Sequence, residues 1–412
     1  MPPTRLRVHV FALSWLAYAS YYIGRKQFAV SKASLASQYH LTTEALGRID
    51  TGYLVAYSLG MFASGWLCDR VGPRRLLGAG MLASAAAVAW FGASSAEMWF
   101  AVAFTVNGLA QSTGWPGTIK AMAPWWSAGE RGKIMGWWST CYQVGGIVAT
   151  ALASALLVHA GWRSAFWVPA VWMALVGLVV LWRLPDSPQA GPPAEGAEKA
   201  RAHVERRIEI WYLGFIYFGF KLIRYSLLFW LPFYLQRQLG YSAGQAGYLS
   251  ISFELGGVCG TVASGIVFDR MGARQRAVLF AMTFGLALSL VLYTQVAAWG
   301  AVANFAAMAA VGFMLFGPDA LISGAMAQEL GGAEGAGSAS GIINGIGSLG
   351  AIAQGTVTAV VATRYGWDRV FHLFIGLAFA CAAALLPYAL GRRSAKVTPR
   401  AAPSREAAPV AR

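Results

Sequence analysis

Long apolar stretches, separated by short polar ones, follow one another along almost the whole chain. Each stretch is about 20 residues long, which is the length that a helix needs to cross the hydrocarbon of a membrane. The pattern predicts an all-α integral membrane protein with twelve transmembrane helices. The predicted spans are 8–31, 46–67, 75–95, 98–119, 134–158, 164–183, 209–235, 246–268, 277–298, 300–325, 338–362 and 368–390.

One polar stretch is long enough to divide the chain. Residues 184–207 read LPDSPQAGPPAEGAEKARAHVERR, and their Pro, Gly and mixed charges break the apolar pattern. This organisation predicts an N-terminal six-helix bundle at 1–183, a cytoplasmic linker at 184–207, a C-terminal six-helix bundle at 208–391 and a basic cytoplasmic tail at 392–412.

The two halves repeat one another. The segment SGWLCDRVGPRR at 64–75 returns as SGIVFDRMGARQR at 264–276. Gly161-Trp162 likewise returns as Gly366-Trp367. A duplication of this kind predicts two pseudo-symmetric bundles, with the substrate site between them near the middle of the membrane.

The duplicated loop places an acid at the end of a span and several bases after it. Such an acid can pair with neighbouring helix ends and latch one side of the protein. A tight turn that carries topology charges is the alternative. The predicted gating residues of this loop are Asp69, Arg70, Asp269 and Arg270.

Composition and charge agree with a membrane protein. Hydrophobic residues make up 57% of the chain and charged residues 12%, too few charges to coat a soluble protein of 412 residues. The net charge is +15, but 22 of the 32 Lys and Arg lie in the termini and in the loops after even-numbered helices, against six in the other loops. This bias predicts cytoplasmic termini in a cell (inner) membrane, and no nucleic-acid partner.

Four further cations fall inside predicted spans, where a charge at mid-membrane costs roughly 3 kcal/mol. Arg25 and Arg224 lie 199 positions apart in equivalent helices of the two halves. Because a guanidinium matches phosphate or carboxylate, the pair predicts an anion bound between the bundles. Lys26 follows Arg25 directly, and Lys221 precedes Arg224 by three residues on the same helix face, although a lysine that snorkels to water is the alternative.

Four segments resemble a known family. They are YYIGRKQFAVS at 21–31, NGLAQSTGWPGTIKAMAPWWSAGERGKIMGWWSTCYQVGG at 107–146, RYSLLFWLPFYL at 224–235 and GPDALISGAMAQEL at 317–330. With the duplicated loop, they resemble the major facilitator superfamily and, within it, the organophosphate:phosphate antiporter family.

The resemblance implies roles for particular residues. Arg25 and Arg224 match the arginines that grip the substrate phosphate in that family, and Glu254 matches an acid that pairs with a site cation. Lys26 belongs to the same signature as Arg25. Side chains at pocket-lining positions are Tyr18, Tyr22, Tyr57 and Trp115, each of which has helix packing as its alternative. Tyr142 and Gln143 stand where glycerol-phosphate members have His and Asn, so the pocket departs from a familiar one.

These features predict a transporter that exchanges an organic phosphate ester for inorganic phosphate by alternating access. Its expected partners are the small anionic substrate, phosphate and membrane lipids, and its functional unit is expected to be a monomer. The sequence has no nucleotide-binding loop, metal-ligand spacing or nucleophile constellation, so neither enzyme chemistry nor a cofactor or metal is expected. Two alternatives stay open: a proton-coupled carboxylate symporter that uses Asp319 or Glu254 as its proton site, and a transporter-like sensor of sugar phosphate.

Overall fold

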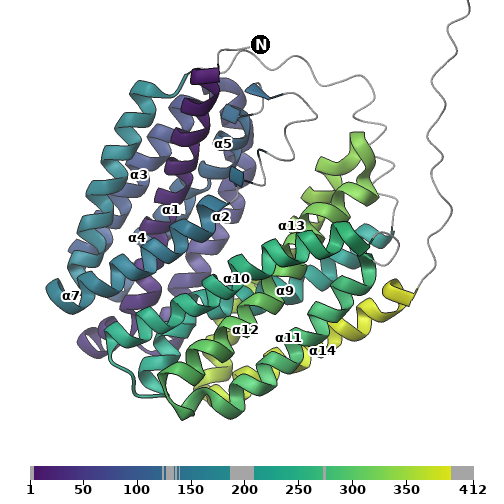
Figure 1. The fold of residues 1–412 in the computed structure, drawn as a ribbon. Helices are drawn as coiled ribbons and strands as arrows, with labels where there is room; N and C mark the ends of the chain where they lie inside the picture. The colour runs from purple at the N-terminus through teal and green to yellow at the C-terminus, as the bar shows by residue number, and fades with distance from the viewer. Residues whose placement is uncertain are drawn as a thin grey trace, which may run out of the picture.

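The computed structural model describes residues 4–122, 125–126, 134, 137–138, 140–185, 208–271 and 275–390. All regular structure in these residues is helical, so the predicted all-α class is confirmed. Figure 1 shows that the helices form two groups, one purple to teal and the other teal-green to yellow. Each predicted span falls on a helix, although the span predicted at 134–158 begins among residues outside the described part.

The N-terminal group contains the helices that precede the linker. They are α1 (Thr4–Tyr39), α2 (Thr43–Val71), α3 (Pro73–Ala93), α4 (Glu97–Gln111), α5 (Gly114–Met122) and α7 (Thr140–Arg183). The C-terminal group contains α9 (Ile208–Arg237), α10 (Ala243–Met271), α11 (Gln275–Val296), α12 (Ala301–Ala320), α13 (Ala327–Tyr365) and α14 (Trp367–Leu390). A 3₁₀ turn at Ala297–Trp299 precedes α12, and a π-helical segment at Leu321–Met326 joins α12 to α13.

Two glycines explain one part of the internal repeat. Gly161 has φ 79° and divides α7 into two successive passes, and Gly366 has φ 84° and separates α13 from α14. Because a side chain disfavours positive φ, glycine suits both turns. The tryptophan that follows each glycine begins the next pass, so the repeated Gly-Trp pairs mark equivalent helix junctions.

Eight of the described helices are long and apolar enough to cross a membrane, and one of them is the two-pass α7. Helix α1 does not meet this criterion despite its 36 residues. It carries Arg25, Lys26 and Lys32, which are all buried in the protein. Their burial explains how a helix of low hydropathy can belong to the interior of a membrane protein.

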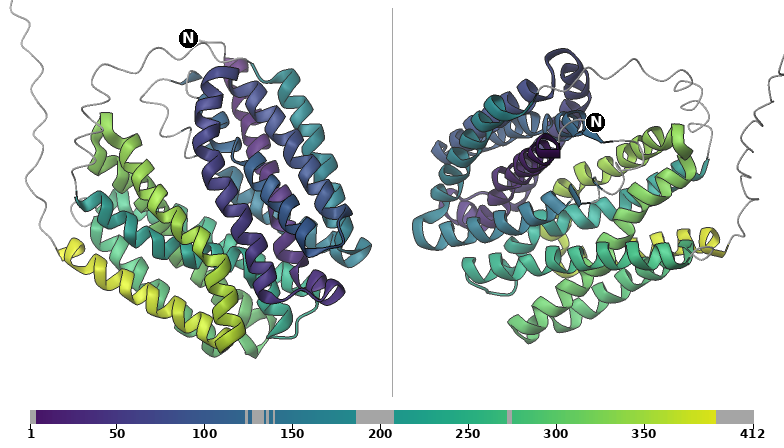
Figure 2. Two further views of the ribbon diagram at one scale, coloured as in Figure 1. Left: turned by 180° about the vertical axis from the view of Figure 1, so that it is seen from behind. Right: turned by 45° about the horizontal axis from the view of Figure 1, so that its top comes forward.

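The two groups approach each other at the end opposite the N-terminus and diverge toward it (Figures 1 and 2). Helix α2 packs against α13, α7 against α10, and α1 against α9. At the close end, the hydroxyl oxygens of Thr51 and Thr356 lie 3.1 Å apart, and Arg237 donates to the hydroxyl of Ser37 at 2.7 Å. A Cβ added to Gly47 would lie 2.5 Å from the carbonyl oxygen of Gly355, so glycine permits this approach.

Three predicted helix boundaries are wrong. The first helix continues beyond residue 31 to Tyr39, so Lys32 lies inside it and not in a loop. The span at 98–119 is interrupted by a turn at Ser112 and Thr113, between α4 and α5. The loop expected between 325 and 338 is instead helical, because α13 begins at Ala327.

Candidate anion-binding site

Arg25 is buried inside the N-terminal group, with 7% of its surface exposed. Its Nε donates to Oε1 of Gln111 at 3.1 Å, and the hydroxyl of Tyr53 donates to the same oxygen at 2.9 Å. The guanidinium carbon lies 4.9 Å from the ring centre of Tyr22 and 5.1 Å from that of Tyr57. Neutral groups therefore hold Arg25, and no carboxylate of the described residues lies within 4 Å of it.

Gln111 owes its position to the break in the fourth span. It is the last residue of α4, and its amide nitrogen donates to the Ser84 hydroxyl and to Oδ1 of Asn107, both at 3.3 Å. The Asn107 amide in turn donates to the carbonyl oxygen of Gly24 at 2.9 Å. This buried network fixes the acceptor that orients Arg25. Neither Gln111 nor Tyr53 was identified from sequence, because polar residues in an apolar helix do not reveal their partners.

Arg224 occupies the corresponding place in the C-terminal group but has different surroundings. Its Nη1 donates to Oδ2 of Asp319 at 2.7 Å, and its guanidinium carbon lies 4.5 Å from the ring centre of Phe316. The two side chains of the ion pair are 13% and 9% exposed. Asp319 thus neutralises Arg224 directly, whereas Arg25 has no acidic partner in the described part of the chain.

Lys26 and Glu254 form an ion pair between the two groups of helices. The Lys26 ammonium on α1 lies 3.3 Å from Oε1 of Glu254 on α10. Lys26 is also within electrostatic range of Arg25 and Arg224. These contacts bring the two predicted arginines into one charged region at the junction of the groups.

The charges of this region, which are buried except for the partly buried Arg224, do not cancel. Its cations are Arg25, Lys26, Lys221 and Arg224, and its carboxylates are Glu254 and Asp319. Four cations against two carboxylates leave a formal charge of +2. Burying uncompensated charge is costly, so the region favours an anion that supplies the missing negative charge.

The predicted aromatic residues form a cluster beside Arg25. The ring centre of Tyr18 lies 6.1 Å from that of Tyr22, 5.9 Å from that of Trp115 and 5.1 Å from that of Trp138. Tyr142 packs against the same cluster. Tyr22 and Tyr57 therefore contact the Arg25 guanidinium, whereas Tyr18 packs against Tyr22 and Trp115 packs against Tyr18.

Gln143 lies between the two groups of helices. Its amide nitrogen on α7 donates to the Thr261 hydroxyl on α10 at 3.4 Å. This bond is another contact across the junction.

A second buried charge pair was missed in the sequence. Lys32 and Asp50 form an ion pair whose side chains are both fully buried. The Lys32 ammonium also donates to the carbonyl oxygen of Phe229 in the other group at 3.0 Å, and it lies 3.7 Å from the ring centre of Trp230. Lys32 was assigned to a loop because its apolar run ends at residue 31, yet it is an interior residue that links the groups.

Of the four residues predicted to form a latch, the structure describes the side chains of the two arginines. Arg70 lies in the last turn of α2 and Arg270 in the last turn of α10, and both are exposed. The side chains of Asp69 and Asp269 lie outside the described part of the structure.

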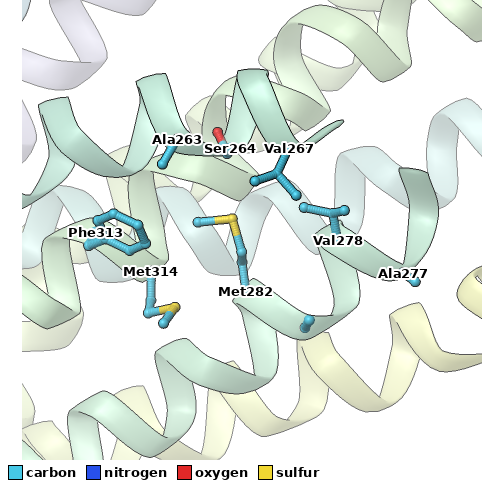
Figure 3. Close-up of a pocket in the computed structure, with 9 residues that line it drawn as sticks. Ala263, Ser264, Val267, Ala277, Val278, Met282, Phe313 and Met314 are labelled. Atoms are coloured by element: carbon cyan, nitrogen blue, oxygen red, sulfur yellow. The ribbon is translucent and has the colours of Figure 1, made fainter. Parts of the chain in front are cut away.

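A cavity of about 440 Å³ lies elsewhere, between α10, α11 and α12 (Figure 3). Its lining includes Ala263, Val267, Met282, Phe313 and Met314, with Ser264 as its polar residue. In the described part of the chain, this lining contains no charged side chain, which makes it unsuited to an anion. Among the described residues, no group of three or more His, Cys, Asp or Glu has the arrangement to hold a metal ion.

Comparison with known proteins identifies the family. Residues 14–355 match the family model described as Major Facilitator Superfamily. The chain belongs to the Major Facilitator Superfamily. It is therefore a multi-pass integral membrane transporter and not an enzyme, as the sequence predicted.

Curated relatives place the chain more narrowly in this superfamily. It is 30% identical to "Sugar phosphate exchanger 3" of Mus musculus, over 89% of each chain. It is 29% identical to "Putative glycerol-3-phosphate transporter 1" of Arabidopsis thaliana, over 90% of this chain and 85% of that protein. It is 28% identical to "Probable hexose phosphate transport protein" of Chlamydia muridarum, over 92% of this chain and 90% of that protein. The predicted resemblance to the organophosphate:phosphate antiporter family is confirmed.

Solved structures agree on the fold. A bacterial homologue of the human lysosomal transporter Spinster, in an inward-facing conformation, superposes with a TM-score of 0.76 at 14% identity, covering 93% of this chain and 95% of that one. The D-xylose–proton symporter superposes with a TM-score of 0.73 at 16% identity, covering 92% of this chain and 97% of that one. At these identities, the similarity establishes the shared fold.

Proposed function

We propose that the protein exchanges an organic phosphate ester for inorganic phosphate across the membrane. The observation that carries this proposal is the buried region with a formal charge of +2, to which each group of helices contributes an arginine. A phosphate monoester carries nearly two negative charges at pH 7, and inorganic phosphate has comparable charge. The names of the sugar-phosphate, glycerol-phosphate and hexose-phosphate relatives support the same substrate class.

Arg25 and Arg224 are the proposed phosphate ligands. Each guanidinium presents a planar fork that suits phosphate oxygens, and one donor of Arg224, its Nε, has no hydrogen-bond partner in the described residues. Tyr22 and Tyr57 form the neighbouring wall, and Lys26 and Lys221 add positive charge. Tyr18, Trp115, Tyr142 and Gln143 are proposed to shape the remaining pocket.

Transport follows from alternating access between the two groups of helices. We infer that the present conformation opens toward the side that holds the N-terminus, because the groups meet at the opposite end (Figure 2). Residues 1–183 and 208–391 are proposed to rock as two bodies around the bound anion. Asp69, Arg70, Asp269 and Arg270 are proposed to latch the side that is open here.

The charge of the empty site explains why exchange is favoured over one-way transport. When no anion is bound, closing the site from both sides encloses a region whose formal charge of +2 is not compensated. The resulting repulsion raises the free energy of the empty occluded state. Either phosphate or the organic phosphate removes this penalty, so the loaded protein crosses between its two open states more readily.

The remaining proposals concern location and assembly. The distribution of Lys and Arg supports cytoplasmic termini in the cell (inner) membrane. One chain contains both arginines, so a monomer suffices for function, with lipids as its surroundings and no nucleic-acid partner. The proposal places Glu254 in gating, because it bridges the groups through Lys26.

Exchange in proteoliposomes tests the proposed function. Vesicles that contain the purified protein are loaded with radiolabelled phosphate, and efflux is measured while external anions are varied. We expect efflux to require an external phosphate ester or phosphate. Efflux that responds to a pH gradient and to external carboxylates, but not to phosphate esters, would instead support the proton-coupled symporter. Binding of sugar phosphate without any flux would support the sensor.

A further inference from the structure

The two proposed phosphate ligands are held in different ways. Arg25 donates to the neutral Gln111, whereas Arg224 donates to the carboxylate of Asp319. One oxygen of the Asp319 carboxylate, Oδ2, accepts from the Arg224 guanidinium, as a phosphate oxygen can. When no substrate is bound, the Asp319 carboxylate therefore occupies one of the hydrogen-bond donors that Arg224 would offer to phosphate.

A second cation lies near the same carboxylate. Lys221 is one helical turn before Arg224 and is buried, with its ammonium 5.1 Å from the ring centre of Tyr217. Among the described residues, no carboxylate lies within 4 Å of Lys221. Asp319 is nevertheless within electrostatic range of Lys221. The buried Lys221 and the partly buried Arg224 are thus both within electrostatic range of one carboxylate, which bonds to Arg224 alone of the two.

The backbone around Asp319 is irregular. Pro318 precedes it and lacks the N–H that a helix uses, and the π-helical segment Leu321–Met326 begins two residues after it. One-turn π-helical segments inside helices occur frequently at functional sites. Asp319 therefore lies beside an irregular part of the helix, of a kind that is frequent at functional sites.

We propose that Asp319 is a tethered carboxylate that holds Arg224 in the empty site and moves to Lys221 when a phosphate group takes Arg224. This inference rests on the proposed function. Both states then keep the aspartate beside a cation, which avoids the cost of a buried carboxylate without a partner. In the release step, Asp319 returns to Arg224 and competes with the departing phosphate. Lys221 acts on affinity through Asp319, as a positioning residue.

Phosphate binding to four proteins tests this exchange of partners. The dissociation constant of inorganic phosphate is measured by calorimetry for the full chain in detergent, as wild type, Asp319→Asn, Lys221→Met and the double variant. Asp319→Asn removes the competitor, so we expect about tenfold tighter binding. Lys221→Met leaves the displaced carboxylate without its second partner, so we expect about tenfold weaker binding. In the Asp319→Asn background, Lys221→Met should change affinity by less than about threefold.

Controls separate these effects from loss of folding. Asp368→Asn makes the same substitution at an exposed residue near the start of α14, and its phosphate affinity should equal that of the wild type. The double variant removes one buried cation and one buried anion together, so the charge of the site is kept. If Asp319→Asn alone fails to fold, the double variant replaces it as the test of competition. The double variant should bind phosphate more tightly than the wild type.

Four results contradict the inference. Unchanged or weaker binding by Asp319→Asn would show that the carboxylate does not compete with phosphate. If Lys221→Met weakened phosphate binding equally in the wild type and in Asp319→Asn, Lys221 would contact the anion itself. Weaker phosphate binding by the double variant than by the wild type would show the same. A wild-type protein that binds neither phosphate nor phosphate esters would overturn the proposed function, and this inference with it.

Discussion

At the scale of single residues, the two arginines are equivalent in sequence but not in their contacts. Arg25 and Arg224 were identified because a buried guanidinium is costly unless an anion compensates it. Their partners could not be predicted, because Gln111 is 86 residues from Arg25 and Asp319 is 95 residues from Arg224. Only the fold brings these pairs together. Sequence therefore located the cations, and the structure supplied the groups that orient them.

The geometry of the guanidinium is predicted to be essential at both positions. Arg25→Lys and Arg224→Lys keep a positive charge but lose the planar fork, so each should weaken phosphate binding. A hydrogen bond to a charged group contributes about 1.5–3 kcal/mol, which corresponds to roughly 10- to 100-fold in affinity. Calorimetry on purified variants measures this loss, and monodisperse elution in detergent shows that folding is retained. Near-native affinity in Arg224→Lys would rule out the proposed phosphate ligand.

Gln111 is predicted to act on affinity by positioning Arg25. Gln111→Met removes the acceptor of the Arg25 Nε, so the phosphate dissociation constant should rise about three- to tenfold. Gln354→Met is the matched control, because both amide atoms of Gln354 are buried without a partner in the described residues. The control should leave affinity unchanged. Equal phosphate affinity in Gln111→Met and the wild type would remove the positioning role.

At the scale of elements, helix α1 links the groups through two charged residues that lie six positions apart. Lys26 pairs with Glu254, and Lys32 pairs with Asp50 while donating to the Phe229 carbonyl. The hydropathy pattern predicts that this helix ends at residue 31, because Lys32 interrupts the apolar run, whereas the helix ends at Tyr39. Its burial depends on a partner in α2 and a carbonyl in α9, which a pattern within one helix does not reveal.

Breaking the Lys32–Asp50 pair is predicted to destabilise the protein. Lys32→Met leaves Asp50 buried without its cation, which typically costs about 3–5 kcal/mol. The double variant Lys32→Met with Asp50→Leu removes both charges and should recover most of that loss. Thermal unfolding in detergent compares the three proteins. If Lys32→Met unfolds at the wild-type temperature, the pair does not contribute to stability as proposed.

The close approach of α2 and α13 yields a prediction about conformation. A Cβ on Gly355 would lie 2.6 Å from the Thr51 hydroxyl oxygen and 2.8 Å from the Gly47 carbonyl oxygen. Gly355→Val should therefore separate the groups at this end and slow exchange. Gly376→Val is the control, since a Cβ there meets nothing within 4 Å.

Distances between spin labels, one on each group at the end opposite the N-terminus, measure the effect. We expect a longer distance in Gly355→Val only. Equal distance distributions in both variants would exclude this contact as a determinant of closure.

At the scale of the whole molecule, the internal repeat predicted much of the architecture. Equivalent Gly-Trp pairs correspond to equivalent turns, and the two arginines lie in equivalent helices α1 and α9. The repeat could not predict which end of the molecule is closed, because both conformations of a two-bundle transporter use the same helices. That information lies in contacts such as Thr51 with Thr356, which join residues 305 positions apart.

The central claim is that one phosphate group binds Arg25 and Arg224 together, from opposite groups of helices. A structure determined by electron cryomicroscopy in saturating phosphate tests it most directly. We predict phosphate density within hydrogen-bond distance of both guanidinium groups, with Asp319 displaced from Arg224 toward Lys221. Phosphate bound elsewhere, or to one arginine while the Arg224–Asp319 pair stays intact, would contradict the account.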